Sequence, residues 1–141
     1  MKHPGVLASA AILALQSLLG SGCLLWKIDQ APSGFAIVRE HMISAPRNDP
    51  PVTSTLDFTI TAIDGAAVVR EKVPPWVDMQ RGALVAAGAH QFKAWVAPHT
   101  RPRDYQPKEV SFAASVDSGK VYFLVDRDGA PVLIEEHLAP R

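Results

Sequence analysis

Apolar side chains recur at every second position along much of this chain, which is the spacing of a half-buried β-strand. The alternation runs through 55–62, 89–96 and 108–115, whereas no helical period continues for ten residues after residue 23. Nine glycines and twelve prolines favour turns over long helices. The pattern predicts an all-β fold, a small antiparallel β-sandwich of about six to eight strands, after an N-terminal apolar signal or anchor helix.

Turn residues divide the alternating segments. Asp64-Gly65 is a dipeptide favoured where a tight turn needs positive φ, and it predicts a hairpin over 55–73. Residues 44–54 contain three prolines and predict a loop, while 121–125 are almost wholly apolar, as in a central strand covered on both faces. The expected core comprises Leu56, Phe58, Ile60, Phe92, Val96, Val110, Phe112, Val121 and Phe123.

The first 23 residues have the pattern of an export signal. A short positive start is followed by 6–19, fourteen residues without charge. That length suits a signal peptide and is short of the roughly 20 residues of a membrane span. Ser21 and Gly22 then precede Cys23, the only cysteine of the chain. The segment resembles a bacterial lipoprotein signal, which implies cleavage before Cys23 and acylation of its sulfur, although Gly20 stands where such signals usually have Leu.

Two other interpretations of this segment stay open. One is an ordinary secretory signal that leaves Cys23 as a free thiol. The other is an uncleaved anchor over 4–26, because 24–26 prolong the apolar run to spanning length. All three place the residues after Cys23 outside the cytoplasm. In the lipoprotein interpretation, Leu24 stands where an Asp would mark retention in the inner membrane. The resemblance therefore implies a lipid anchor in the outer membrane, with the domain facing the periplasm.

A second resemblance covers roughly residues 56–125. The run Ile63-Asp64-Gly65, the segment 85–92 (VAAGAHQF), the run 110–112 and the run 119–122 (GKVY) resemble PEGA-like β-sandwich modules of small bacterial envelope proteins. In those modules an (I/V)DG turn precedes a V-x-x-G-x-H-x-(F/V) strand and a later G-x-x-Y strand. The resemblance implies a non-catalytic envelope module, and the loop 98–107 is not part of its pattern.

The expected organisation has four parts. Residues 1–22 form a lipoprotein-type signal peptide, 23–34 a tether, 35–137 the β-sandwich domain and 138–141 a tail.

The residue pattern predicts no catalytic, metal or cofactor site. The histidines after the signal are separated by 49, 9 and 38 residues, unlike the short local spacing of many metal sites, and a single cysteine excludes a Cys-rich one. They are His41, His90, His99 and His137. Glu135 and Glu136 point to opposite faces if they lie on a strand, so they do not predict a carboxylate pair. Fourteen basic and fourteen acidic residues argue against a nucleic-acid partner.

The candidate protein-contact residues are aromatic side chains and arginines. Arg101, Arg103 and Tyr105 lie in the proline-stiffened loop 98–107, and Arg and Tyr are enriched at binding hot spots. Trp76 follows Pro74-Pro75, and Trp95 lies on the wetter face of its strand. A solvated connecting loop and sheet-packing tryptophans are the alternatives.

These observations favour a membrane-tethered bacterial envelope lipoprotein without an enzymatic activity. We expect it to act as a binding or structural module, an accessory subunit of an envelope assembly with envelope proteins as partners. The competing hypothesis is a small periplasmic ligand carrier or enzyme with a site near His90. A deep pocket lined by His90 and a carboxylate would favour the competing hypothesis, and a filled sandwich core would favour the binding module.

Overall fold

A computed structural model of the chain describes residues 24–25, 31–40, 43–68 and 82–140. These residues form eleven strands and no helix, which confirms the all-β prediction. The predicted N-terminal helix, Cys23 and Trp76 lie outside the described residues. The strands are β1 Leu24–Leu25, β2 Phe35–Arg39, β3 Ser44–Ala45, β4 Val52–Thr53, β5 Leu56–Ile63, β6 Ala66–Ala67, β7 Gly82–Ala86, β8 Gly88–Pro98, β9 Lys108–Val116, β10 Val121–Arg127 and β11 Ala130–Glu135.

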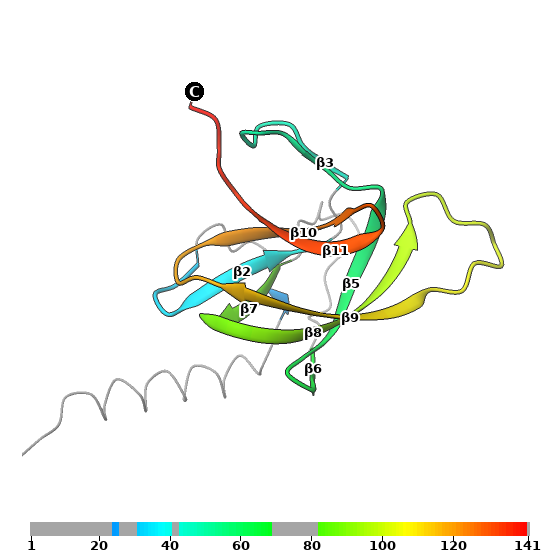
Figure 1. Cartoon of the computed structure of the whole chain (residues 1–141), viewed down its shortest axis with the longest axis horizontal. Helices are drawn as coiled ribbons and strands as arrows, with labels where there is room; N and C mark the ends of the chain where they lie inside the picture. Colours follow the sequence, from blue (N-terminus) through cyan, green and yellow to red (C-terminus); the bar gives the residue numbers. More distant parts are fainter. Residues whose placement is uncertain (1–23, 26–30, 41–42, 69–81, 141) are drawn as a thin grey trace, which may run out of the picture.

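The two large sheets lie face to face (Figure 1). One has the strand order β1-β7-β2-β10-β11, and the other has the order β6-β5-β8-β9. A single cluster of buried side chains joins them, with Val38, Val85 and Leu124 from the first sheet and Phe58, Phe92 from the second. One packed apolar cluster of described residues therefore lies between the sheets.

The first sheet is mixed rather than antiparallel throughout. β2 pairs with β10 in parallel, Val121 opposite Ile37 and Phe123 opposite Arg39, while every other strand pair in the described residues is antiparallel. The prediction of two antiparallel sheets is wrong at this pair. Parallel neighbours need a long crossover, and here the whole second sheet lies between β2 and β10 in the sequence.

Of the nine predicted core residues, four are buried between the sheets, two are buried on the opposite face of β10, and three are half-buried. Phe58, Ile60, Phe92 and Val96 are buried between the sheets as expected. On β10, however, Tyr122 and Leu124 face this core, while Val121 and Phe123 are buried on the opposite face. Three further members of the predicted set, Leu56, Val110 and Phe112, are half-buried at the rim of the main core. The strand is apolar on both faces, so its sequence carries no alternation that distinguishes them.

The outer face of β10 is covered by a segment that the sequence predicts to be a loop. Residues 44–54 contain the short antiparallel pair β3–β4, and Val52 packs against Phe123 and Val125. The tail predicted from residue 138 also contacts this segment. The Ala139 amide donates to the Arg47 carbonyl at 2.9 Å. Leu138 forms an isolated antiparallel β-bridge with Asn48, which is buried.

The tight turn predicted at Asp64-Gly65 is present, and a second one occurs at Asp128-Gly129. Asp64 and Gly65 have φ angles of 51° and 79° between β5 and β6, and Asp128 and Gly129 have 52° and 83° between β10 and β11. Positive φ at both central residues is the type I′ geometry that matches the twist of a hairpin.

A buried carboxylate supports an irregularity in β5. The β5–β8 register shifts between Ile60 and Ala62, which ends the alternation and turns Ile63 rather than Ala62 into the core. Glu40, 1% exposed after β2, accepts a hydrogen bond from the Ile60 amide at 2.6 Å. Because β2 and β5 belong to different sheets, this bond links the two layers.

Candidate functional site

The outer face of the four-stranded sheet carries a groove beside an exposed tryptophan. Trp95 on β8 is 47% exposed and stands directly opposite Thr59 of β5 and Glu109 of β9. The groove has a volume of about 270 Å³. It is lined by Asp57, Thr59, Thr61, Trp95, Val96, Ala97, Arg101 and Pro107.

The structure brings together some of the predicted contact residues and separates others. Trp95 and Arg101 line the same groove although one is on a strand and the other in the 98–107 loop. Tyr105 is half-buried, with its hydroxyl 3.5 Å from the Val96 carbonyl, so it supports the loop. Arg103 is exposed and is not among the residues that line the groove.

Asp57 organises one end of the groove. Its Oδ1 lies 2.6 Å from His99 Nδ1, and its Oδ2 lies 3.5 Å from Arg101 Nη2. The other ring nitrogen of His99 lies 2.5 Å from the Ser54 carbonyl. Both nitrogens of His99 therefore face oxygen atoms, one of Asp57 and one of Ser54. His99 and Arg101 lie on two sides of the Asp57 carboxylate, which holds the start of the loop against β5.

Asp57, Thr59 and Thr61 are groove residues that the sequence interpretation did not select. Their signal was present, because they alternate with the buried Phe58 and Ile60 and so had to share the wet face. What the sequence did not contain was the pairing of Thr59 with Trp95, since register across a sheet depends on the partner strand.

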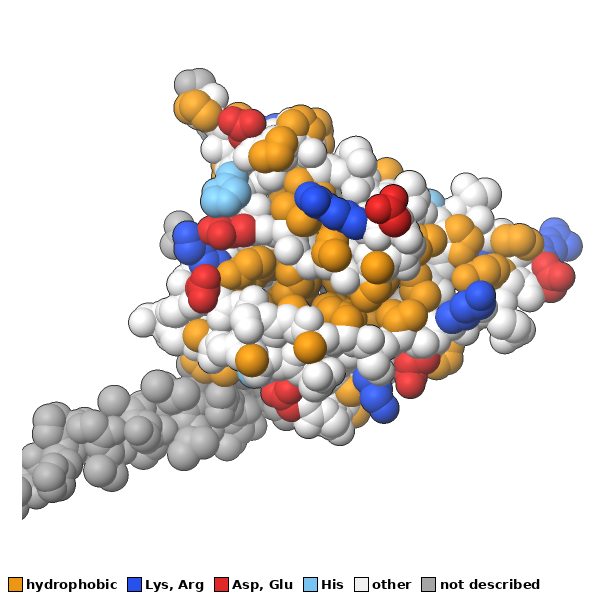
Figure 2. Space-filling model, in the orientation of Figure 1, with side chains coloured by type: hydrophobic (Ala, Val, Ile, Leu, Met, Phe, Trp, Pro, Cys, Tyr) orange, Lys and Arg blue, Asp and Glu red, His pale blue; other side chains and the backbone are white. Residues whose placement is uncertain are grey.

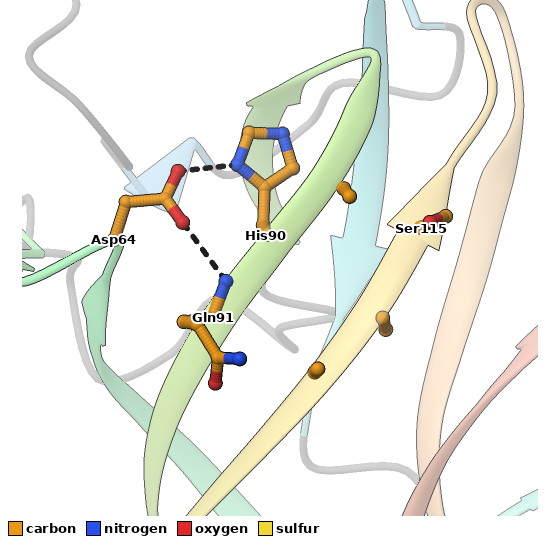
Figure 3. Close-up of a pocket in the computed structure, with 7 residues that line it drawn as sticks. Asp64, His90, Gln91 and Ser115 are labelled. Carbon is orange, nitrogen blue, oxygen red and sulfur yellow. Dashed lines mark hydrogen bonds and ion pairs between the residues drawn. The ribbon is translucent and has the colours of Figure 1, made fainter.

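A second pocket, of about 430 Å³, surrounds His90 (Figure 3). It is lined by Asp64, Ala89, His90, Gln91, Ala113, Ala114 and Ser115. His90 Nδ1 lies 2.5 Å from Asp64 Oδ2, and the Gln91 amide donates to Asp64 Oδ1 at 2.8 Å. In Figure 3 the Asp64 carboxylate faces the His90 ring and the backbone nitrogen of Gln91, whereas Ser115 lies on β9, away from them.

The hydrogen bonds of this pocket occupy the groups that would carry chemistry. His90 Nε2 lies 2.6 Å from the Ala86 carbonyl, so both ring nitrogens are engaged by acceptors, as in His99. The hydrogen bond from the Gln91 amide, followed by that from His90, holds the pKa of Asp64 below its usual value. The contacts of the His90 ring and of the Gln91 amide with Asp64 fix the β5–β6 turn to β8.

The acidic pair near the C-terminus diverges. Glu135 lies 2.7 Å from Lys120 Nζ, and Glu136 lies 3.8 Å from Arg39 Nε.

In the described part of the chain, no three His, Cys, Asp or Glu side chains group to hold a metal ion. Across residues 24–25, 31–40, 43–68 and 82–140, no helix is long and apolar enough to cross a membrane.

The chain matches no known protein family, no characterised protein and no solved structure with which it was compared. The assignment of a function therefore depends on the geometry of these two sites and on the sequence.

Proposed function

We propose that the protein is a membrane-tethered lipoprotein of the bacterial envelope whose PEGA-like β-sandwich is a non-catalytic binding module. In this proposal the acylated Cys23 anchors the protein in the outer membrane, and the domain faces the periplasm. The groove beside Trp95 receives an envelope protein. The partner, rather than a cofactor or metal, completes the site.

The observation that carries the proposal is the meeting of Trp95 and Arg101 in one groove. A large aromatic side chain that is 47% exposed leaves apolar area in water, which a partner would cover. Arg and Trp are the side chains most enriched among residues that dominate binding energy. Asp57 holds the start of the loop in place, so Arg101 is positioned before a partner arrives.

The competing hypothesis, a ligand carrier or enzyme at His90, has the second pocket in its favour. Its weakness is that His90 and Asp64 are already bonded to each other and to the backbone. The packed apolar cluster between the sheets also supports a binding module rather than a carrier.

Replacing Trp95 with alanine is expected to weaken partner binding by at least about 2 kcal/mol, roughly 30-fold in Kd. Photo-crosslinking from position 95 in intact cells identifies the partner, and titration of the purified pair measures the affinity. Lys93→Ala is the matched control, because Lys93 is an exposed residue of the same strand and face. Equal loss in both variants, or the same adducts from position 95 and from exposed Ala130, would contradict the proposal.

The anchor is tested by Cys23→Ser, which removes the acceptor thiol with little change in size. We expect the wild type to incorporate labelled palmitate and to run at the mature mass, and the variant to stay unprocessed and unlabelled. Identical cleavage of both proteins into a soluble form would establish an ordinary secretory signal instead. Retention of both uncleaved in the membrane would establish an anchor over 4–26.

A further inference from the structure

The last strand of the four-stranded sheet has a long open edge. β9 pairs with β8 without interruption from Gly88–Val116 to Val96–Lys108, and no strand lies beyond it among the residues that the structure describes. It is nine residues long, whereas the opposite edge, β6, has two. An edge strand presents backbone donors and acceptors that another strand can use.

The outward backbone groups of β9 follow from the hydrogen bonds of β8. The Gln91 amide and carbonyl both bond to Asp64, on the β5 side of β8. Successive residues of a strand direct these groups to opposite sides, so those of Phe92 point toward β9 and bond its partner, Phe112. The amides and carbonyls that point away from the sheet are consequently those of Glu109, Ser111, Ala113 and Ser115.

β9 lacks the features that protect edges. It contains no proline and no bulge in its pairing, and its only charges are Lys108 and Glu109 at its first two positions. β11, the longer of the two edge strands of the other sheet, is shorter than β9 and has Pro131 near its start. Proline at an edge removes a donor and opposes pairing, so β9 is the edge more open to a partner strand.

The side chains next to this edge are apolar and incompletely covered. Val110, Phe112 and Ala114 are half-buried and pack at the rim of the main core. Apolar side chains gather across the middle of the molecule, between the β8–β9 layer and the β10–β11 layer (Figure 2). A strand added at β9 would extend the covered interior.

We propose that a second copy of this chain is the partner, paired antiparallel through β9, with Phe112 opposite Phe112 at the twofold axis. In this register, Ser111 faces Ala113 of the partner and Glu109 faces Ser115 of the partner. All four outward-pointing residues of each copy then form hydrogen-bonded pairs, and the Phe112 pair is of the close type, with Cα atoms about 4.5 Å apart.

Charge favours this self-pairing over registers shifted toward the start of β9. No like charges meet in it, because Lys108 faces Val116 and Glu109 faces Ser115. Registers centred on position 108 or 109 would place Lys against Lys or Glu against Glu, which destabilises a sheet. The formal net charge of zero adds no overall repulsion between copies. The pairing makes one continuous eight-stranded sheet and presents both Trp95 grooves on the same surface.

A charge-exchange experiment tests the pair. The full chain is purified in a density-matched detergent, and its mass is measured by analytical ultracentrifugation. We expect the wild type to be a dimer, and Ser111→Lys/Ala113→Lys and Ser111→Glu/Ala113→Glu each to have half that protein mass, because these exposed positions face each other. Mixing the two variants should restore the dimer. Ala89→Lys/Gln91→Lys, which adds the same charge one strand further in, should remain dimeric.

Proline substitution provides a second measurement. Ala113→Pro removes an outward donor and is expected to give a monomer with the Tm of the Ser111→Lys/Ala113→Lys monomer, whereas Ala114→Pro breaks a bond to β8 and should lower Tm below that value. A monomeric wild type, or a Ser111→Lys/Ala113→Lys variant that stays dimeric, would overturn the proposal. The mass measurement does not depend on acylation of Cys23 or on a bound partner.

Discussion

Replacing Phe92 with alanine is expected to lower the free energy of unfolding by about 3–5 kcal/mol. Phe92 is 0% exposed and lies at the centre of the cluster shared by both sheets. Its ring stacks on Phe112 at a centroid distance of 5.1 Å and meets the edge of His90 at 6.2 Å. Truncation leaves a cavity lined by residues of both sheets, and neither sheet can move to fill it without disturbing its contacts with the other. Urea unfolding followed by circular dichroism measures the loss.

Phe112→Ala is the matched control for this prediction. Phe112 stacks on the same ring from a half-buried position at the rim, so its removal exposes a surface that water already reaches. With both substitutions made in the monomeric Ser111→Lys/Ala113→Lys background, we expect roughly half the loss seen for Phe92, in line with the smaller area removed from water. Equal losses in that background would contradict the prediction.

Replacing Asp126 with alanine is expected to cost about 2–3 kcal/mol, because one carboxylate near the end of β10 accepts several charge-assisted bonds. Its Oδ1 accepts from the Thr55 amide at 2.6 Å, the Leu56 amide at 3.1 Å and the Ser54 hydroxyl at 3.0 Å. Its Oδ2 accepts from the Thr55 hydroxyl at 2.9 Å. These bonds join the first sheet to the start of β5, and solvent reaches part of the group, which limits the cost.

The contribution of Asp126 is expected to depend on pH. Desolvation raises its pKa, but the hydrogen bonds from Thr55, Ser54 and Leu56 outweigh that effect and lower the pKa below its ordinary value of 3.8. A depressed pKa in the folded state means that the stabilisation is complete above the unfolded value and is lost as the pH falls through the folded value. The difference in unfolding free energy between wild type and Asp126→Asn should therefore be constant near neutrality and shrink below about pH 4. A difference that is independent of pH would contradict this.

The local structure was accessible from the sequence where one residue or one strand decides it. Asp64-Gly65 specifies a type I′ turn because both positions need positive φ. The alternation of Phe58 and Ile60 with Asp57 and Thr59 specifies which side of β5 is wet. The exposure of Trp95 followed in the same way, because it alternates along β8 with the buried Phe92, Ala94 and Val96 and so lies on the other face of the strand.

The tertiary structure decided everything that depends on a partner strand. The parallel pairing of β2 with β10 and the burial of Phe123 on the outer face, under β3–β4, have no signal within those strands, because residues 35–38 and 121–125 are apolar on both faces. The groove exists because β5 lies beside β8 in a register that places Thr59 against Trp95, and because Asp57 draws Arg101 toward them. Backbone alternation is a property of one strand and can be derived from its own residues, whereas order, register and covering segments are set by competition among all the strands for one interior.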